Sequence, residues 1–288
     1  MDGSHHLEIP GHVSLAAGHG GLPKVSIETP WSSAEIYLHG AHVTGFRKNG
    51  EAPLLFMSGA SEFAAGKPIR GGVPIIFPWF GPREGMPAHG FARTAAWDLK
   101  ETSLLPDGAV SLRFSLPARD GFDVEYLVTV AESLSMELAV TNTGGQDATI
   151  ETCLHTYFKI GAIDAISITG LSGVNYLDKL TGTSATDAPG PIHIAGEVDR
   201  IYLDTATAVE IEDPALGRKI RIATTGSNST VVWNPWIEKS RRMPDFGDDE
   251  YLQMVCVESG NVAKNQITLT AGGRAVLKVD VSSEPLDT

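Results

Sequence analysis

The sequence has few of the features that mark several large classes of protein. It contains only two cysteines, Cys153 and Cys256, and their positions give neither a disulfide framework nor the spacing of a metal site. No apolar run approaches the roughly 20 residues that a membrane-spanning helix needs. No secretory signal pattern is recognisable either. These absences predict a protein of the reducing cytoplasm that does not enter a membrane.

Positive charge is also scarce. Lysine and arginine number 22 against 35 aspartates and glutamates, which gives a net charge of −13. Such a balance opposes general binding to nucleic acid or to an anionic membrane surface. An anionic small molecule remains a possible ligand wherever basic side chains gather locally.

Helical patterning is nearly absent, whereas patterns typical of strands are frequent. No span keeps apolar residues at helical spacing beyond two turns, and 31 glycines and 17 prolines indicate many turns. Apolar and polar residues alternate over 110–116, 124–130, 134–140 and 277–281. We therefore predict an all-β protein, a single-domain large antiparallel β-sandwich. Its expected span is 25–283, after a mobile N-terminal segment over 1–24.

Three segments are less regular. Residues 54–58 are a candidate buried strand, and residues 181–200 are predicted to be rich in loops. Residues 67–82 combine three prolines and three glycines with apolar residues, which predicts a rigid, shaped loop rather than a central strand.

Two arginines belong to stiff, glycine-rich loops. Arg70 lies in the 67–82 loop, and Arg93 ends the next loop, which also carries His89. The planar fork of arginine suits a phosphate, so this pair could hold a phosphorylated ligand. The alternative is that each arginine pairs with a nearby acid such as Glu62 or Glu84.

His155 and Glu258 each stand in an apolar strand pattern. A histidine flanked by aromatic residues is a natural proton donor, because its pKa lies near working pH. Burial would raise the pKa of Glu258 toward that of a useful general base. The alternatives are a structural histidine and a glutamate that points to water.

Asp199 and Trp233 are candidates for contacts with a sugar. The carboxylate could bind a hydroxyl group, and the indole offers a flat apolar face, although tryptophan is also common in protein cores. The acidic cluster at 245 and 248–250 lacks the spacing of a calcium loop and is interpreted as a solvated turn.

Six ordered motifs resemble those of the glucose-6-phosphate 1-epimerase family (hexose-6-phosphate mutarotases) of the aldose-1-epimerase superfamily. They are IRGGVPIIFPWFG, HGFAR, LHTYF, EVDRIY, VVWNPW and MVCVES, and the resemblance covers roughly residues 25 to 283. It implies a galactose-mutarotase-like β-sandwich without metal or organic cofactor. The implied reaction is the interconversion of the α and β anomers of a hexose 6-phosphate.

The resemblance also implies roles for individual residues. His155 matches the general acid and Glu258 the general base, while Arg70 and Arg93 match contacts to phosphate and substrate. Asp199 matches a substrate-binding aspartate, and His89 is a further candidate. One departure is Ala88, which stands where the family often has a substrate-binding glutamine.

Two other function classes compete with this reading. A glycoside hydrolase could use Asp199 and Glu258 as paired carboxylates. A lectin-like module would bind sugar through Trp233 and Trp236 and would not need His155. A monomer is expected, because no coiled-coil seam is visible in the sequence.

Overall fold

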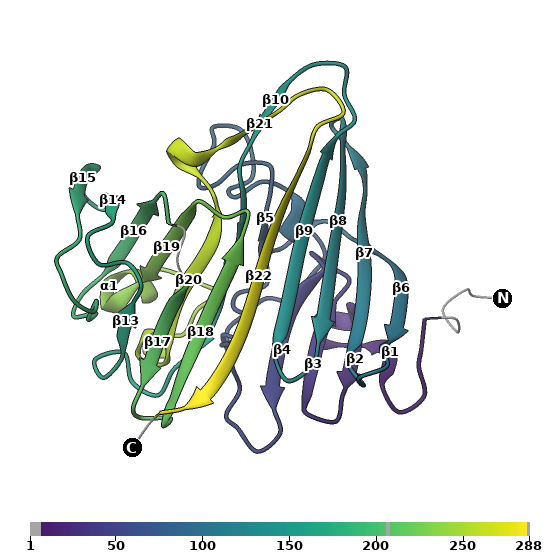
Figure 1. Cartoon of the computed structure of the whole chain (residues 1–288), viewed down its shortest axis with the longest axis horizontal. Helices are drawn as coiled ribbons and strands as arrows, with labels where there is room; N and C mark the ends of the chain where they lie inside the picture. The colour runs from purple at the N-terminus through teal and green to yellow at the C-terminus, as the bar shows by residue number, and fades with distance from the viewer. Residues whose placement is uncertain (1–6, 206–207, 287–288) are drawn as a thin grey trace.

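The structure is a computed structural model that describes residues 7–205 and 208–286. Its antiparallel strands form two eight-stranded sheets, one four-stranded sheet and one two-stranded sheet (Figure 1). The strands are β1 (Val13–Ala17), β2 (Pro23–Glu28), β3 (Ser32–Tyr37), β4 (His42–Lys48), β5 (Ile75–Ile76), β6 (Asp98–Leu104), β7 (Val110–Arg119), β8 (Phe122–Val130), β9 (Leu134–Asn142), β10 (Ala148–Ile150), β11 (Thr152–Leu154), β12 (Tyr157–Lys159), β13 (Ser167–Thr169), β14 (Asn175–Asp178), β15 (Thr183–Thr186), β16 (Val198–Leu203), β17 (Val209–Asp213), β18 (Arg218–Thr225), β19 (Ser229–Asn234), β20 (Met254–Asn261), β21 (Ile267–Leu269) and β22 (Arg274–Pro285).

Helical segments are few and short. They are α1 (Trp236–Ser240), η2 (His19–Gly21), η3 (Ala92–Thr94), η4 (Glu250–Gln253) and η5 (Ala263–Asn265). Within the described part of the chain, none of the helices is long and apolar enough to cross a membrane.

One eight-stranded sheet follows directly from the alternating segments of the sequence. Its strand order is β13-β17-β18-β22-β9-β8-β7-β6, and Figure 1 shows the long strand β22 between β18 and β9. Along β7 the apolar residues Val110, Leu112 and Phe114 are buried, whereas the polar residues between them are partly exposed. Alternation of this kind places every second side chain in the core. The strands predicted over 110–116, 124–130 and 134–140 are confirmed as β7, β8 and β9.

The other eight-stranded sheet contains a strand that is buried throughout. Its order is β15-β14-β16-β19-β20-β11-β5, and β12 also pairs with β20. All eight residues of β20 are buried, because neighbouring strands flank it and packed side chains cover both of its faces. A polar side chain on this strand is therefore removed from water.

One large apolar cluster joins the sheets. It includes Val43 of the four-stranded sheet, Phe114 and Val279 of one eight-stranded sheet, and Val257 of the other. A core shared in this way makes the chain one domain. The predicted all-β antiparallel sandwich is confirmed.

The sheet structure begins earlier than predicted. The mobile segment expected over 1–24 is wrong for Val13–Ala17, which form β1 and pair with β2. Residues 1–6 of that expected segment lie outside the described residues. The N-terminal pattern was missed because β1 carries only one buried residue, Val13.

Two other local predictions need correction. Residues 54–58 form no continuous strand, because Leu55 bridges to Phe158 whereas Met57 bridges to Gly71. The 181–200 segment contains β15, whose four residues are all exposed and so show no apolar alternation. The 67–82 loop is irregular as predicted and contains only the two-residue strand β5.

Candidate active site

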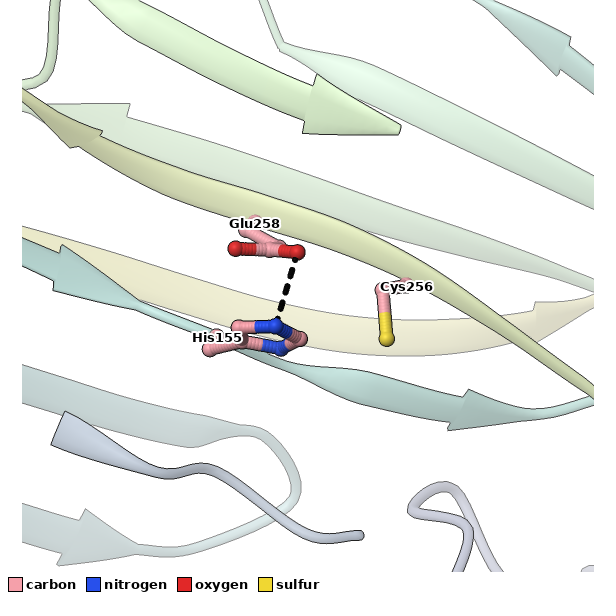
Figure 2. Close-up of side chains that lie close together, drawn as sticks. All are labelled: His155, Cys256 and Glu258. Atoms are coloured by element: carbon pink, nitrogen blue, oxygen red, sulfur yellow. Dashed lines mark ion pairs between the residues drawn. The ribbon is translucent and has the colours of Figure 1, made fainter. Parts of the chain in front are cut away.

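Strand pairing brings His155 and Glu258 together. His155 lies in a two-residue break between β11 and β12, and both strands pair with β20, which carries Glu258. Leu154 is opposite Ser259 and Tyr157 is opposite Cys256, so the break faces Glu258. The Nε2 atom of His155 lies 3.1 Å from Oε1 of Glu258 (Figure 2).

Both side chains are withdrawn from solvent. Glu258 is 1% exposed and His155 is 8% exposed, which answers the alternative that Glu258 points to water. Burial raises the pKa of Glu258 well above its usual range, with Asp199 adding to the effect. Burial and the nearby His89, Arg93 and Arg70 hold the pKa of His155 well below its usual range.

The other polar side-chain atoms of His155 and Glu258 have weak hydrogen bonds or none among the described residues. The Nδ1 atom of His155 is buried without a hydrogen-bond partner among the described residues. A doubly protonated imidazole donates from both nitrogens, so the lack of an acceptor at Nδ1 also disfavours the charged form of His155. On the other side, the Cys153 thiol donates to Oε2 of Glu258 at 3.7 Å. The pair therefore holds a single proton most readily.

A cavity of about 300 Å³ opens above the pair. This volume lies at the lower end of the roughly 300–1,000 Å³ typical of small-molecule sites. The walls combine aromatic and charged side chains, namely Arg70, Phe80, His89, His155, Tyr157, Lys179, Asp199, Trp233, Lys239, Met243 and Glu258. A ligand of sugar size with an anionic group matches this lining.

His89 faces the cavity as a neutral side chain. Its Nδ1 accepts a hydrogen bond from the backbone N–H of Gly81 at 3.2 Å, so the proton of the neutral ring lies on Nε2. Burial and nearby cations, Arg93 first among them, lower its pKa to about 3. Its ring meets that of His155 edge-on, with 5.8 Å between centroids. The side chain can therefore donate one hydrogen bond to a ligand.

Arg70 lines the cavity but is already paired. Its Nη2 and Nε donate to Asp245 at 2.9 Å and 3.1 Å, and its Nη1 donates to the Tyr157 hydroxyl at 3.0 Å. The acid partner is thus Asp245, not Glu62 or Glu84. The interpretation of the acidic cluster as a solvated turn is wrong for Asp245, whose side chain is 18% exposed. Sequence separation of 175 residues hid this pair.

Arg93 is not among the residues that line the cavity, but its charge acts on His89 and His155. It belongs to η3, and its Nη2 donates to the carbonyl oxygen of Ala88 at 2.9 Å. Its Nε is buried without a partner among the described residues. Burial lowers the pKa of its guanidinium to about 10, which leaves it charged at neutral pH. The Arg93 guanidinium therefore adds a positive charge near the site, and its Nε–H has no acceptor among the described residues.

Asp199 and Trp233 lie on neighbouring strands, and a third residue, Cys256, continues the row on the next strand. Asp199 of β16 is opposite Trp233 of β19, which is opposite Cys256 of β20. Trp233 is 8% exposed and meets the His155 ring edge-on at 6.1 Å between centroids. Burial raises the pKa of Asp199, while Lys179 opposes that shift. Trp233 is therefore both a packed residue and part of the cavity wall.

Sequence patterns did not reveal the two lysines of the site. Lys179 follows β14 and Lys239 belongs to α1, and neither stands in a motif or an amphipathic pattern. Their ammonium groups lie 3.5 Å and 3.8 Å from Oδ2 of Asp199. Only the pairing of β14 with β16 and the position of α1 after β19 bring them together.

A cysteine completes a cluster with the pair. The ligand atoms of His155, Cys256 and Glu258 lie within 4.8 Å of one another, and Figure 2 shows the three side chains together. Burial raises the pKa of the Cys256 thiol well above its usual range, which disfavours the thiolate that binds metal. The arrangement suits proton transfer between His155 and Glu258 better than it suits a metal ion.

Comparisons with known proteins show the family of the chain. The profile of the aldose 1-epimerase family matches residues 23–282. A "putative glucose-6-phosphate 1-epimerase" of Cenchrus ciliaris is 34% identical over 88% of this chain and 82% of its own length. A protein of the same name from Escherichia coli K12 is also 34% identical, over 85% of both chains.

Solved structures give the same result. A "putative mutarotase" from Salmonella typhimurium superposes with a TM-score of 0.89 and 28% identity, over 97% of this chain and 96% of that chain. The sequence match and the shared fold agree. The chain therefore belongs to the aldose 1-epimerase family.

Proposed function

We propose that the protein interconverts the α and β anomers of D-glucose 6-phosphate, with His155 and Glu258 as its acid and base. The observation that carries this proposal is the 3.1 Å contact between Nε2 of His155 and Oε1 of Glu258 in the wall of a cavity of about 300 Å³. Ring opening needs one group that gives a proton and one that takes a proton at the same time. The names of the related proteins point to the same substrate.

Each step of the reaction moves protons in a balanced way. The reaction runs from the form in which the single proton of the pair lies on His155 and Glu258 is a carboxylate. Glu258 takes the proton of the C1 hydroxyl while His155 gives its proton to the ring oxygen, and the bond between C1 and that oxygen breaks. Rotation about the C1–C2 bond then turns the aldehyde to its other face. The reverse transfers close the ring as the other anomer, so the enzyme returns to its starting state without a cofactor.

The remaining predicted residues position the sugar in this proposal. The Asp199 carboxylate accepts hydrogen bonds from sugar hydroxyls, His89 donates from Nε2, and Trp233 provides a flat apolar face. The positive charges of Arg70 and Arg93 add to the field that draws an anionic sugar to the cavity, although Asp245 offsets much of the Arg70 charge. Ala88 offers no side-chain amide, so the usual glutamine contact is absent here.

Two competing functions are not favoured. The family of the chain does not favour a non-catalytic sugar-binding module or a glycoside hydrolase. Within the proposal, the protein acts as a monomer in the cytoplasm on a phosphorylated hexose.

Anomer relaxation tests the proposal directly. Fresh α-D-glucose 6-phosphate is followed by polarimetry or NMR with wild type, His155→Gln and Glu258→Gln. We expect each variant to lose about 10²–10⁴-fold in kcat, and the double variant to lose little more, because the two groups act as a unit. Folding is checked by circular dichroism. A wild type that leaves the spontaneous rate unchanged would overturn the proposal.

A further inference from the structure

The cations of the cavity differ in how fully they are paired. Arg70 donates three hydrogen bonds of 2.9–3.2 Å to Asp245 and one to Tyr157. Its charge is balanced by that of Asp245, and each of its three nitrogens already donates a hydrogen bond. Lys179 and Lys239 also line the cavity. Their ammonium groups lie farther from the neighbouring carboxylates than the Arg70 guanidinium lies from Asp245.

The two lysines share one carboxylate oxygen. Nζ of Lys179 lies 3.5 Å and Nζ of Lys239 lies 3.8 Å from Oδ2 of Asp199. Lys239 also lies 3.3 Å from Glu197. All three distances exceed the roughly 2.7–2.9 Å of a charge-assisted hydrogen bond. Each ammonium group therefore keeps protons that a ligand can accept.

Each of the two ammonium groups lies over an aromatic ring of the cavity wall. Lys179 lies over Phe80, with Nζ 5.1 Å from the ring centroid, and Lys239 lies over Trp233 at 5.7 Å. Such contacts orient a cation without using its hydrogen-bond donors. The side chains are 30% and 32% exposed, so both are partly accessible as they line the cavity.

The position of the lysines fits the length of a sugar phosphate. Asp199 lies on β16, two strands away from β20 and Glu258. Neighbouring strands lie about 4.8 Å apart, which puts β16 roughly 10 Å from β20. A hexopyranose with a phosphate on its exocyclic carbon spans a distance of this order. Its C1 end can lie at Glu258 while its phosphate lies between the lysines.

We propose that Lys179 and Lys239 together bind the phosphate group of the substrate. This binding gives the enzyme its preference for phosphorylated over free hexoses. This inference rests on the proposed substrate class. Because both ammonium groups lie close to the same oxygen of Asp199, one phosphate with its several oxygens can contact both. Asp199 is then released to bind sugar hydroxyls. Arg70 remains paired with Asp245 and supports the wall.

Binding measurements with two ligands test the lysine pair. The dissociation constants of D-glucose 6-phosphate and of D-glucose are measured by calorimetry for wild type, Lys179→Met and Lys239→Met. Methionine keeps the apolar stem that packs on the aromatic ring but removes the charge. We expect each variant to bind the phosphate sugar roughly 10- to 100-fold more weakly and to bind glucose as wild type does.

Two further variants separate this role from general effects. Lys100→Met removes a lysine that pairs with Asp98 at 2.9 Å on a distant exposed strand, and we expect it to change neither constant. Lys179→Arg keeps the charge, and we expect it to keep most of the preference. Thermal unfolding verifies that all variants are folded.

The outcomes distinguish this inference from the proposed reaction. Lysine variants that bind the phosphate sugar as tightly as wild type, or that lose affinity for both sugars equally, overturn the lysine pair. A wild type without preference for the phosphate sugar also overturns it. A preference that disappears in the lysine variants, in a protein that accelerates no anomer exchange, supports the lysine pair and refutes the epimerase proposal.

Discussion

At the scale of single residues, burial sets the protonation of His155 and Glu258. Removing water disfavours both the Glu258 carboxylate and the His155 imidazolium, which share a 3.1 Å contact. The state with one proton on the pair is therefore stable over a wide pH range. In the proposed reaction, activity falls on the acid side when the pair takes a second proton, because Glu258 can then no longer act as base. It falls on the alkaline side when the pair loses its last proton, because His155 can then no longer act as acid.

This argument predicts the pH dependence of catalysis. The pKa of His155 lies well below 6.5, so we expect kcat/KM to stay level as pH falls through 6.5 and to decline only further down. The raised pKa of Glu258 moves the alkaline decline well above 4.5. The measurement is kcat/KM from pH 4.5 to 9, corrected for spontaneous anomer exchange. An acid midpoint at or above 6.5 would contradict the assignment.

Folding must be followed in the same pH series. The buried His42 donates from Nε2 to the carbonyl oxygen of Gly71 at 2.8 Å, and burial lowers its pKa to about 3. Because the folded value lies below the unfolded value of 6.5, its contribution to stability is present above pH 6.5 and is lost as pH falls. The slope is at most about 1.4 kcal/mol per pH unit. Thermal melts at each pH identify the range in which the protein stays folded.

Local sequence signals reached only part of the site. His155 and Glu258 could be named because each stands alone in an apolar strand and in a motif of the family. Their contact could not be derived, since it depends on β11, β12 and β20 pairing in one register. The pairing of Arg70 with Asp245 and the convergence of Lys179 and Lys239 depend on long-range folding, which leaves no local pattern.

At the scale of elements, strand pairing fixes the geometry of the site. β20 pairs with β11, β12 and β19, and its small residue Gly260 lies opposite Cys153 of β11. A Cβ atom built at Gly260 would lie 2.3 Å from the carbonyl oxygen of Thr152 and 2.8 Å from Cys153. Close approach of β11 to β20 therefore requires glycine here.

Gly260→Ala tests this requirement. The added methyl group pushes β11 and the adjoining His155 away from Glu258, and a displacement of about 1 Å can cost roughly 10²-fold in kcat. Overpacking also destabilises a fold by about 1–3 kcal/mol. We expect both losses, measured as kcat for anomer exchange and as the free energy of unfolding in urea.

Gly45→Ala is the matched control. Gly45 is also a strand glycine, in β4, but a Cβ atom there would meet only Glu35, at 3.7 Å. We expect its kcat to match that of wild type. Equal behaviour of the two variants would refute the role assigned to Gly260.

The burial pattern of each strand explains why some strands were predicted and others were missed. β7 and β8 bury one face each, so their alternation is visible in the sequence. β15 is exposed throughout and β20 is buried throughout, and neither alternates. Prediction from alternation works only where a strand separates core from water.

At the scale of the whole molecule, the sandwich architecture follows from composition and alternation, but the strand order does not. Pairing of β22 with both β9 and β18 joins segments far apart in the chain, and no local signal specifies it. The sheets are also joined by Arg218 of β18, which is 5% exposed. It donates to the carbonyl oxygens of Ala52 and Pro53 at 3.0 Å and 2.9 Å, and to Lys159 of β12 at 2.7 Å.

Arg218→Met should therefore weaken the whole sandwich rather than the site alone. Three carbonyl groups lose their donor, and hydrogen bonds to charged groups are worth about 1.5–3 kcal/mol each before relaxation and water entry. We expect a loss of about 3 kcal/mol in the free energy of unfolding in urea, with kcat of the folded protein nearly unchanged. Arg221→Met on the same strand removes only a half-exposed ion pair with Glu210 and should cost less than about 1 kcal/mol. Equal costs for the two variants would show that Arg218 does not join the sheets.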